Sequence, residues 1–232
     1  MIKVSDGLDP LLRRPFSFNK INQEDGSIDI MYRVVGRGTS LLSRYSAGQK
    51  LDLIGPLGNG FRLLSNYRGT IAMIAGGMGI APLYGLTLEL RKRIDRGQLH
   101  LFYGARSEAE LIGDPLLDSL GIQIHLSTED GSKGYQGTVT NLFFHFVSSH
   151  GILPSHLYSC GPLKMQTIIA DWARKNDVAA QMCVESLMAC GFGACLGCAI
   201  PARSSMPRYL HVCKDGPVFD AELIQWESVK CI

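Results

Sequence analysis

The chain has 232 residues and a formal net charge of +2; 46% of its residues are hydrophobic and 19% are charged. This composition is typical of a folded protein of one large domain or two modest ones, and it excludes a disordered chain. The near-neutral charge gives no support to a nucleic-acid or membrane-surface function, no apolar run reaches about 20 residues, and MIKVSDGLDP lacks the pattern of a secretory signal, so we expect a cytoplasmic protein.

Residues 1–65 read as short strands separated by turns. The segments RRPFSFNKIN, SIDIMYRVVG and QKLDLIGPLGNGF alternate apolar residues with glycine and proline, which is typical of a small antiparallel barrel. Arg14 offers a planar cation suited to a pyrophosphate, and Ser17 offers a hydroxyl group. Gly38 and Thr39 precede a helix-like stretch and would offer an anion N–H groups and a hydroxyl. An ordinary surface turn is the alternative interpretation of RRPFS.

The segment TIAMIAGGMGIAPLYGLTLELRKR predicts a buried strand, a glycine-rich turn and an amphipathic helix. Gly76, Gly77 and Gly79 fall at the turn, where small residues let a dinucleotide phosphate approach the backbone and the helix N-terminus. The pattern differs from G-x-G-x-x-G, and a tight turn that binds nothing is the alternative.

Further strands are expected at 99–106, 122–128, 156–162 and 179–185. They alternate with the helical stretches SEAELIGDPLLDSL, TVTNLFFHFVSS and KMQTIIADWARK. This alternation predicts a parallel sheet with helices on both faces, which binds ligands at the carboxyl ends of its strands. That edge would gather the glycine-rich turn, GAR at 104–106, the loop at 127–134 and CGP at 160–162. Their convergence favours nicotinamide binding.

The loop after the strand expected at 99–106 carries mixed signals for the type of nicotinamide cofactor. Arg106 and Ser107 would favour a 2′-phosphate, as in NADP, whereas Glu108 and Glu110 would repel one. The residues themselves therefore leave the choice between NAD and NADP open.

The segment ACGFGACLGC places three cysteines within ten positions. With Cys213 they form the pattern C-x4-C-x2-C-x14-C, made by Cys190, Cys195, Cys198 and Cys213. The x4-x2 spacing is the plant-type ferredoxin pattern for a [2Fe–2S] cluster. Structural zinc, the alternative, prefers two C-x2-C pairs, and only one is present. The interleaved glycines would let the loop direct N–H groups at sulfur.

A cluster of this kind exchanges one electron at a time, whereas a nicotinamide exchanges a hydride. A flavin, which exchanges both, is therefore expected between them. The nucleotide-binding region leaves no obvious place for a second dinucleotide, so the flavin is assigned to residues 1–65. The segment LMACGFGACLGCAIPARSSMP is poor in charge, as the core of an obligate interface would be. A loop packed on its own domain is the other interpretation.

The motifs follow one another in a definite order: RPFS, then GGMGIAP with CGP, then the cysteine block. Together they resemble the ferredoxin–NAD(P) reductase superfamily and, within it, the electron-transfer subunits of NAD-dependent dihydroorotate dehydrogenases. The similar stretches run from residue 11 to residue 226: LLRRPFS, YRVVGRGTSLLS, GPLGNGF, AGGMGIAPL, ESLMACGFGACLGC and HVCKDGPVFDAELIQW.

The resemblance implies a multi-domain chain. It implies a partial FAD-binding β-barrel over residues 1–66, an α/β NAD-binding domain over 67–185 and a [2Fe–2S] module over 186–232. Members of the family usually carry more residues ahead of this segment, so an incomplete barrel is expected.

The implied FAD-binding residues are Arg14, Pro15, Phe16, Ser17, Met31, Tyr32, Arg33, Gly38 and Thr39. The implied NAD-binding residues are Gly76, Gly77, Gly79 and Gly161. Cys160 would lie near the nicotinamide ring as the candidate catalytic residue, and the four clustered cysteines would bind the cluster.

The resemblance also implies a function. An FMN-containing catalytic partner would oxidise dihydroorotate, and this chain would pass the electrons through its cluster and FAD to NAD⁺, in pyrimidine biosynthesis. The implied assembly is a heterotetramer with two subunits of each kind, and NAD is favoured over NADP. One alternative is the diaphorase subunit of a hydrogenase, a sulfite reductase or a glutamate synthase. Another is a zinc-stabilised module without enzymatic activity.

Overall fold

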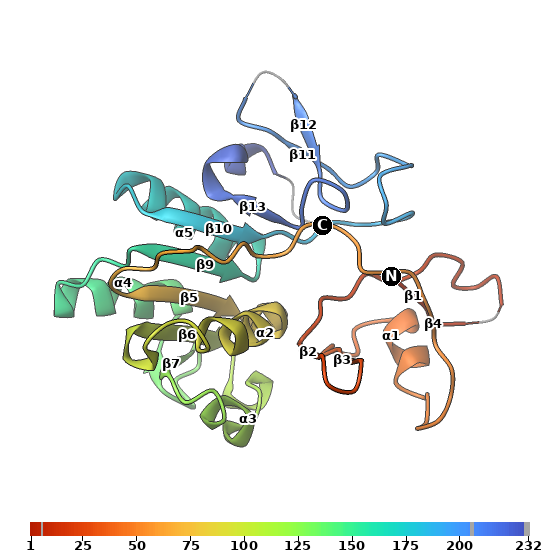
Figure 1. Ribbon diagram of the computed structural model, residues 1–232, viewed down its shortest axis with the longest axis horizontal. Helices are drawn as coiled ribbons and strands as arrows, with labels where there is room; N and C mark the ends of the chain where they lie inside the picture. The colour runs from red at the N-terminus through yellow and green to blue at the C-terminus, as the bar shows by residue number, and fades with distance from the viewer. Residues whose placement is uncertain (6, 205–206, 230–232) are drawn as a thin grey trace.

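The computed structural model describes residues 1–5, 7–204 and 207–229 (Figure 1). Its centre is a seven-stranded sheet with the strand order β13-β10-β9-β5-β6-β7-β8. Every neighbouring pair is parallel except β13 with β10. The strands are β5 (Ile71–Gly76), β6 (Leu99–Ala105), β7 (Gln123–Thr128), β8 (Tyr135–Gln136), β9 (His156–Cys160), β10 (Ala179–Cys183) and β13 (Val218–Asp220).

The parallel sheet expected from the sequence is confirmed. All six residues of β5 are buried, as a central parallel strand with both faces covered requires. Its side chains alternate between two cores: Ala72 and Ile74 belong to one, and Ile71 and Met73 to the other. The four further strands expected from the sequence form β6, β7, β9 and β10, with boundaries shifted by up to two residues.

Helices cover both faces of the sheet. α2 (Ile80–Leu90) contributes to the core of Ile71 and Met73, whereas α4 (Val139–His150) and α5 (Leu163–Lys175) contribute to the core of Ala72 and Ile74. The short helices η1 (Gly77–Gly79) and η2 (Arg96–Gln98) precede α2 and β6, respectively. No helix in the described ranges is both long enough and apolar enough to cross a membrane.

The prediction of one continuous helix over 107–120 is wrong. The chain forms only η3 (Glu108–Glu110) and a five-residue helix, α3 (Asp114–Asp118), in this region. Gly113 between them has extended backbone angles, and a proline stands in the first turn of α3. Because proline has no N–H to donate, it fits a first turn but interrupts a continuous helix.

Residues 1–66 form antiparallel ladders. β1 (Ile2–Lys3) pairs with β4 (Asp52–Leu53), and β2 (Lys20–Asn22) pairs with β3 (Ser27–Asp29). In the described part of this region the strands remain two separate two-stranded sheets. A small core of Ile2, Val4 and Leu42 joins β1 to α1 (Arg37–Leu42).

The C-terminal segment adds a third ladder and closes the chain onto its beginning. β11 (Ala199–Pro201) pairs with β12 (Tyr209–His211), and η4 (Ala221–Leu223) and η5 (Trp226–Ser228) follow β13. Asn59 donates from its backbone N–H to the Gly216 carbonyl at 2.6 Å and from Nδ2 to the Lys214 carbonyl at 2.9 Å. The strand-ladder region and the C-terminal segment are thus directly hydrogen-bonded.

Candidate functional site

The RPFS segment is held in place through backbone pairing of Arg14 with Ile2. The N–H of each residue donates to the carbonyl of the other, at 2.8 and 2.9 Å. Gly38 lies directly against the Arg14 side chain: a Cβ at this glycine would stand 2.8 Å from Nε. Any larger residue at position 38 would therefore displace the guanidinium group.

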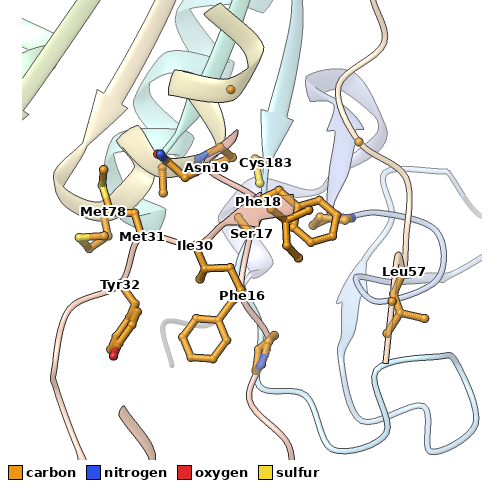
Figure 2. Close-up of a pocket in the computed structure, with 18 of the residues that line it drawn as sticks. Phe16, Ser17, Phe18, Asn19, Ile30, Met31, Tyr32, Leu57, Met78 and Cys183 are labelled. Atoms are coloured by element: carbon orange, nitrogen blue, oxygen red, sulfur yellow. The ribbon is translucent and has the colours of Figure 1, made fainter. Parts of the chain in front are cut away.

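The other predicted flavin-binding segments lie beside RPFS. The rings of Phe16 and Tyr32 meet edge to face with centroids 5.6 Å apart (Figure 2). Thr39 accepts hydrogen bonds on Oγ1 from the N–H groups of Val35 and Gly36, which fixes the loop before α1. Arg33, also predicted to bind flavin, pairs with Glu110 of η3, with Nη1 3.6 Å from Oε2.

A cavity of about 900 Å³ runs between the ladder region, the sheet and the cysteine loop, and its volume suits a cofactor. In Figure 1 the carboxyl ends of β5, β9 and β10 face the ladder region across this space. Figure 2 shows Met31, from the ladder region, near Met78 of η1 on one side of the cavity. The lining residues predicted to bind flavin are Arg14, Pro15, Phe16, Ser17, Met31, Tyr32, Arg33 and Thr39.

The glycine-rich turn packs against the CGP segment at the carboxyl edge of the sheet. A Cβ at Gly79 would lie 2.0 Å from the Cys160 carbonyl oxygen, and one at Gly76 would lie 2.8 Å from Pro162 Cδ. Gly161 has a φ of +156° and approaches the Gly76 backbone. The structure therefore brings the four predicted NAD-binding glycines, Gly77 among them, to one edge, as the sequence predicted.

Cys160 is buried inside this edge and is not one of the residues that line the cavity. It stands in register with Cys183 on β10, and that thiol together with burial raises the pKa of Cys160 well above its usual range. Cys183 and Glu185, to which sequence reasoning gave no catalytic role, do line the cavity. Glu185 is an exposed residue on the cavity wall, and partial desolvation by the surrounding protein raises the pKa of its carboxyl group. Their position at the carboxyl end of the strand predicted over 179–185 was the one signal available.

The four clustered cysteines form two close pairs. Cys190 Sγ accepts a hydrogen bond from the Cys195 N–H at 3.4 Å. Cys198 Sγ lies 3.3 Å from Cys213 Sγ and accepts a hydrogen bond from the Cys213 N–H at 3.4 Å. Gly191 and Gly193 adopt φ values of +83° and +87°, which allow the loop to bend around the sulfur atoms.

These donors suit a two-iron cluster. Within the described residues, no three candidate ligand side chains converge on a point suited to a single metal ion. The two pairs of cysteines supply the four thiol ligands that a [2Fe–2S] cluster requires. Hydrogen bonds from backbone N–H groups lower the pKa of Cys190 to about 6; the N–H of Cys195 has the largest effect and that of Phe192 the next. The lowered pKa favours the thiolate that iron requires.

The comparisons with known proteins agree with this geometry. The family model of the oxidoreductase NAD-binding domain matches residues 73–171. The family model of the iron-sulfur cluster binding domain of dihydroorotate dehydrogenase B matches residues 185–225. The electron transfer subunit of dihydroorotate dehydrogenase B (NAD(+)) from Bacillus caldolyticus is 36% identical over 221 residues, which are 95% of this chain and 82% of that protein. The chain belongs to this family. The relative from Caldanaerobacter subterraneus subsp. tengcongensis is 38% identical over 91% of this chain and 80% of its own length.

A solved structure supports the same family fold. The NADH-dependent reduced ferredoxin-NADP oxidoreductase, which performs flavin-based electron bifurcation, superposes with a TM-score of 0.80 at 25% identity. The match covers 93% of this chain and 75% of that one. The chain therefore combines a ferredoxin reductase-like fold, a parallel-sheet NAD-binding domain and an iron–sulfur-binding domain.

Proposed function

We infer that this chain is the electron-transfer subunit of an NAD-dependent dihydroorotate dehydrogenase and serves pyrimidine biosynthesis. The observation that carries this function is the single cavity shared by three sets of residues. RPFS lines it from the ladder region, Met78 lines it beside the glycine-rich turn, and Gly191 and Cys213 line it from the cysteine loop. Two redox cofactors and a nicotinamide would thus lie within one continuous site.

The chain's own residues account for how each group would be held. Arg14 supplies a charge for the FAD pyrophosphate, and the Phe16 and Tyr32 rings form an apolar wall beside it. The close packing of Gly79 on Cys160 keeps the start of α2 open to a dinucleotide phosphate. When bound, FAD exchanges both a hydride and single electrons, and the cluster exchanges single electrons.

We assign the FAD-binding unit to residues 1–66, the NAD-binding unit to 67–185 and the [2Fe–2S] module to 186–232. Pairing of β13 with β10 makes the module part of the sheet edge rather than a separate body. The described cysteines, Cys190, Cys195, Cys198 and Cys213 among them, are free thiols, which accords with a reducing cytoplasm. Cys160, next to the cavity-lining Cys183, remains the candidate residue closest to the nicotinamide.

The partner is an FMN-containing subunit that oxidises dihydroorotate, in an assembly of two subunits of each kind. Apolar side chains around the cysteine loop support a docking surface: Leu187 is 70% exposed, Phe192 57% and Leu196 58%. Exposed apolar groups gathered on a functional loop are typical of a protein interface.

The function is tested with the purified chain alone and then mixed with the catalytic subunit. Alone, it should absorb visible light as a flavoprotein with an iron–sulfur cluster and should reduce ferricyanide with NADH. It should reduce NAD⁺ with dihydroorotate only after the catalytic subunit is added. Dihydroorotate oxidation by the isolated chain, or zinc without sulfide in the cysteine loop, would refute the function.

A further inference from the structure

Glu110 holds two arginines that come from different parts of the molecule. Its Oε1 pairs with Arg106, and its Oε2 lies 3.6 Å from Nη1 of Arg33. Arg33 also donates from Nη2 to the Glu110 carbonyl at 3.4 Å. The Glu110 side chain is 23% exposed, whereas that of Arg106 is 75% exposed. The carboxylate is therefore the fixed member of this group, and Arg106 is held at the surface.

The ion pair of Glu110 and Arg106 lies just after the end of β6, the strand next to the glycine-rich turn. Gly104 near the end of β6 stands in register with Gly76, where the glycine-rich turn begins. In dinucleotide-binding sheets, the strand next to the glycine-rich turn ends at the adenosine ribose. An acidic residue there favours a free 2′-hydroxyl, whereas an arginine there accommodates a 2′-phosphate. Arg106 is the first residue after β6, so its guanidinium starts from the strand end at which that phosphate would be bound.

We propose that Glu110 is a specificity-determining residue that selects NAD over NADP by occupying Arg106. Because the Arg106 guanidinium is paired with the Glu110 carboxylate, it is not available to bind a 2′-phosphate. The negative charge of Glu110 would also repel that phosphate. An isolated exposed ion pair would contribute little free energy toward holding Arg106 in this position. Here, however, Arg33 and the partial burial of Glu110 keep the carboxylate in position. The inference rests on the proposed NAD-linked function and adds the residue that makes the selection.

A second charged pair in the same loop provides a matched control. Glu108 lies 3.4 Å from Lys133 Nζ and pairs with that lysine rather than with Arg106. Glu108→Gln and Glu110→Gln each remove one negative charge from η3. Only Glu110→Gln removes the carboxylate that forms the ion pair with Arg106.

The test measures binding by calorimetry, which does not depend on turnover. The probes are 5′-AMP and adenosine 2′,5′-bisphosphate, which differ only by the 2′-phosphate. In Glu110→Gln, affinity for the bisphosphate relative to 5′-AMP should rise roughly tenfold, the size expected when one charge-assisted hydrogen bond is gained. The ratio of kcat/KM for NADPH to that for NADH, with ferricyanide as acceptor, should rise in parallel.

The double variant Glu110→Gln/Arg106→Gln should lose this gain, because the freed guanidinium is absent. An unchanged binding ratio in Glu110→Gln, an equal gain in Glu108→Gln, or a gain that persists in the double variant would each overturn the proposal. A parent protein that binds neither probe would overturn the nucleotide site itself and the proposal with it. A parent that binds 5′-AMP but does not oxidise NADH would instead refute the proposed function, while the binding ratio would still decide the role of Glu110.

Discussion

The sulfur atoms of Cys198 and Cys213 lie 3.3 Å apart although the two residues are 15 positions apart in the chain. Both side chains are buried. Burial, together with the nearby Cys198 thiol, raises the pKa of Cys213 to about 11. Two thiols held this close, with β11 and β12 paired between them, form one half of the ligand set that the cysteine spacing predicted.

Cys213→Ser should abolish the cluster, because a hydroxyl is a poor ligand for iron compared with a thiolate. Iron and acid-labile sulfide should fall from about two of each per chain to well below one. Cys183→Ser, which changes a cysteine outside the cluster ligands, is the control and should keep both. Full iron content in Cys213→Ser would remove Cys213 from the ligand set.

Arg14→Ala should weaken FAD binding by roughly 10- to 100-fold, because a charge-assisted hydrogen bond contributes about 1.5–3 kcal/mol. Arg13→Ala is the matched control, since the Arg13 guanidinium bonds the backbone and carboxylate of Asp52 instead. Titration of flavin-free protein with FAD, followed by flavin fluorescence, measures both. Equal dissociation constants for the two variants would contradict the role of Arg14.

Gly79→Ala should destabilise the protein by about 2–4 kcal/mol. The new Cβ would meet the Cys160 carbonyl oxygen at 2.0 Å, so that α2 or β9 must shift. Gly60→Ala is the control, because its Cβ would enter open space. Urea denaturation of the two variants gives the comparison, and stabilities within 1 kcal/mol of each other would show that the packing is not as described.

Stability should fall as the pH drops from about 6.5 towards 4. Burial and the neighbouring His100 lower the pKa of His125 from 6.5 to about 4, and His100 Nδ1 lies 3.0 Å from His125 Nε2. The unfolded chain binds protons in this range that the folded chain excludes, so acid favours unfolding. Partial exposure limits the contribution of His125 to about 1–2 kcal/mol. His125→Gln should flatten the dependence of the free energy of unfolding on pH more than His145→Gln; equal slopes would exclude His125 as a cause.

Phe192→Asp should weaken binding of the catalytic subunit at least tenfold, because a charge would enter an apolar interface. Leu153→Asp is the control: this leucine is 51% exposed and precedes β9, at the opposite end of that strand from Cys160. Analytical ultracentrifugation of each variant with the catalytic subunit measures the effect. Equal affinities would place the interface elsewhere.

The sequence predicted the features that depend on local pattern. The apolar run of β5 and the spacing from Cys190 to Cys198 need only neighbouring residues to be recognised. The missed features depend on contacts across the fold. Cys183 reaches the cavity because β10 ends beside β9, and Glu110 meets Arg33 because two distant regions pack together. The 107–120 helix was mispredicted because apolar periodicity outweighed a glycine and a proline that interrupt it.

The hydrogen bonds from Asn59 to Gly216 and Lys214 have a thermodynamic consequence. They join positions more than 150 residues apart and close a loop that contains every strand of the seven-stranded sheet except β13. Closing so long a loop costs conformational entropy, which is recovered only when all the enclosed elements are folded. Heating should therefore release flavin and iron over the same temperature range instead of in two separate steps, because the strand-ladder region and the sheet unfold together.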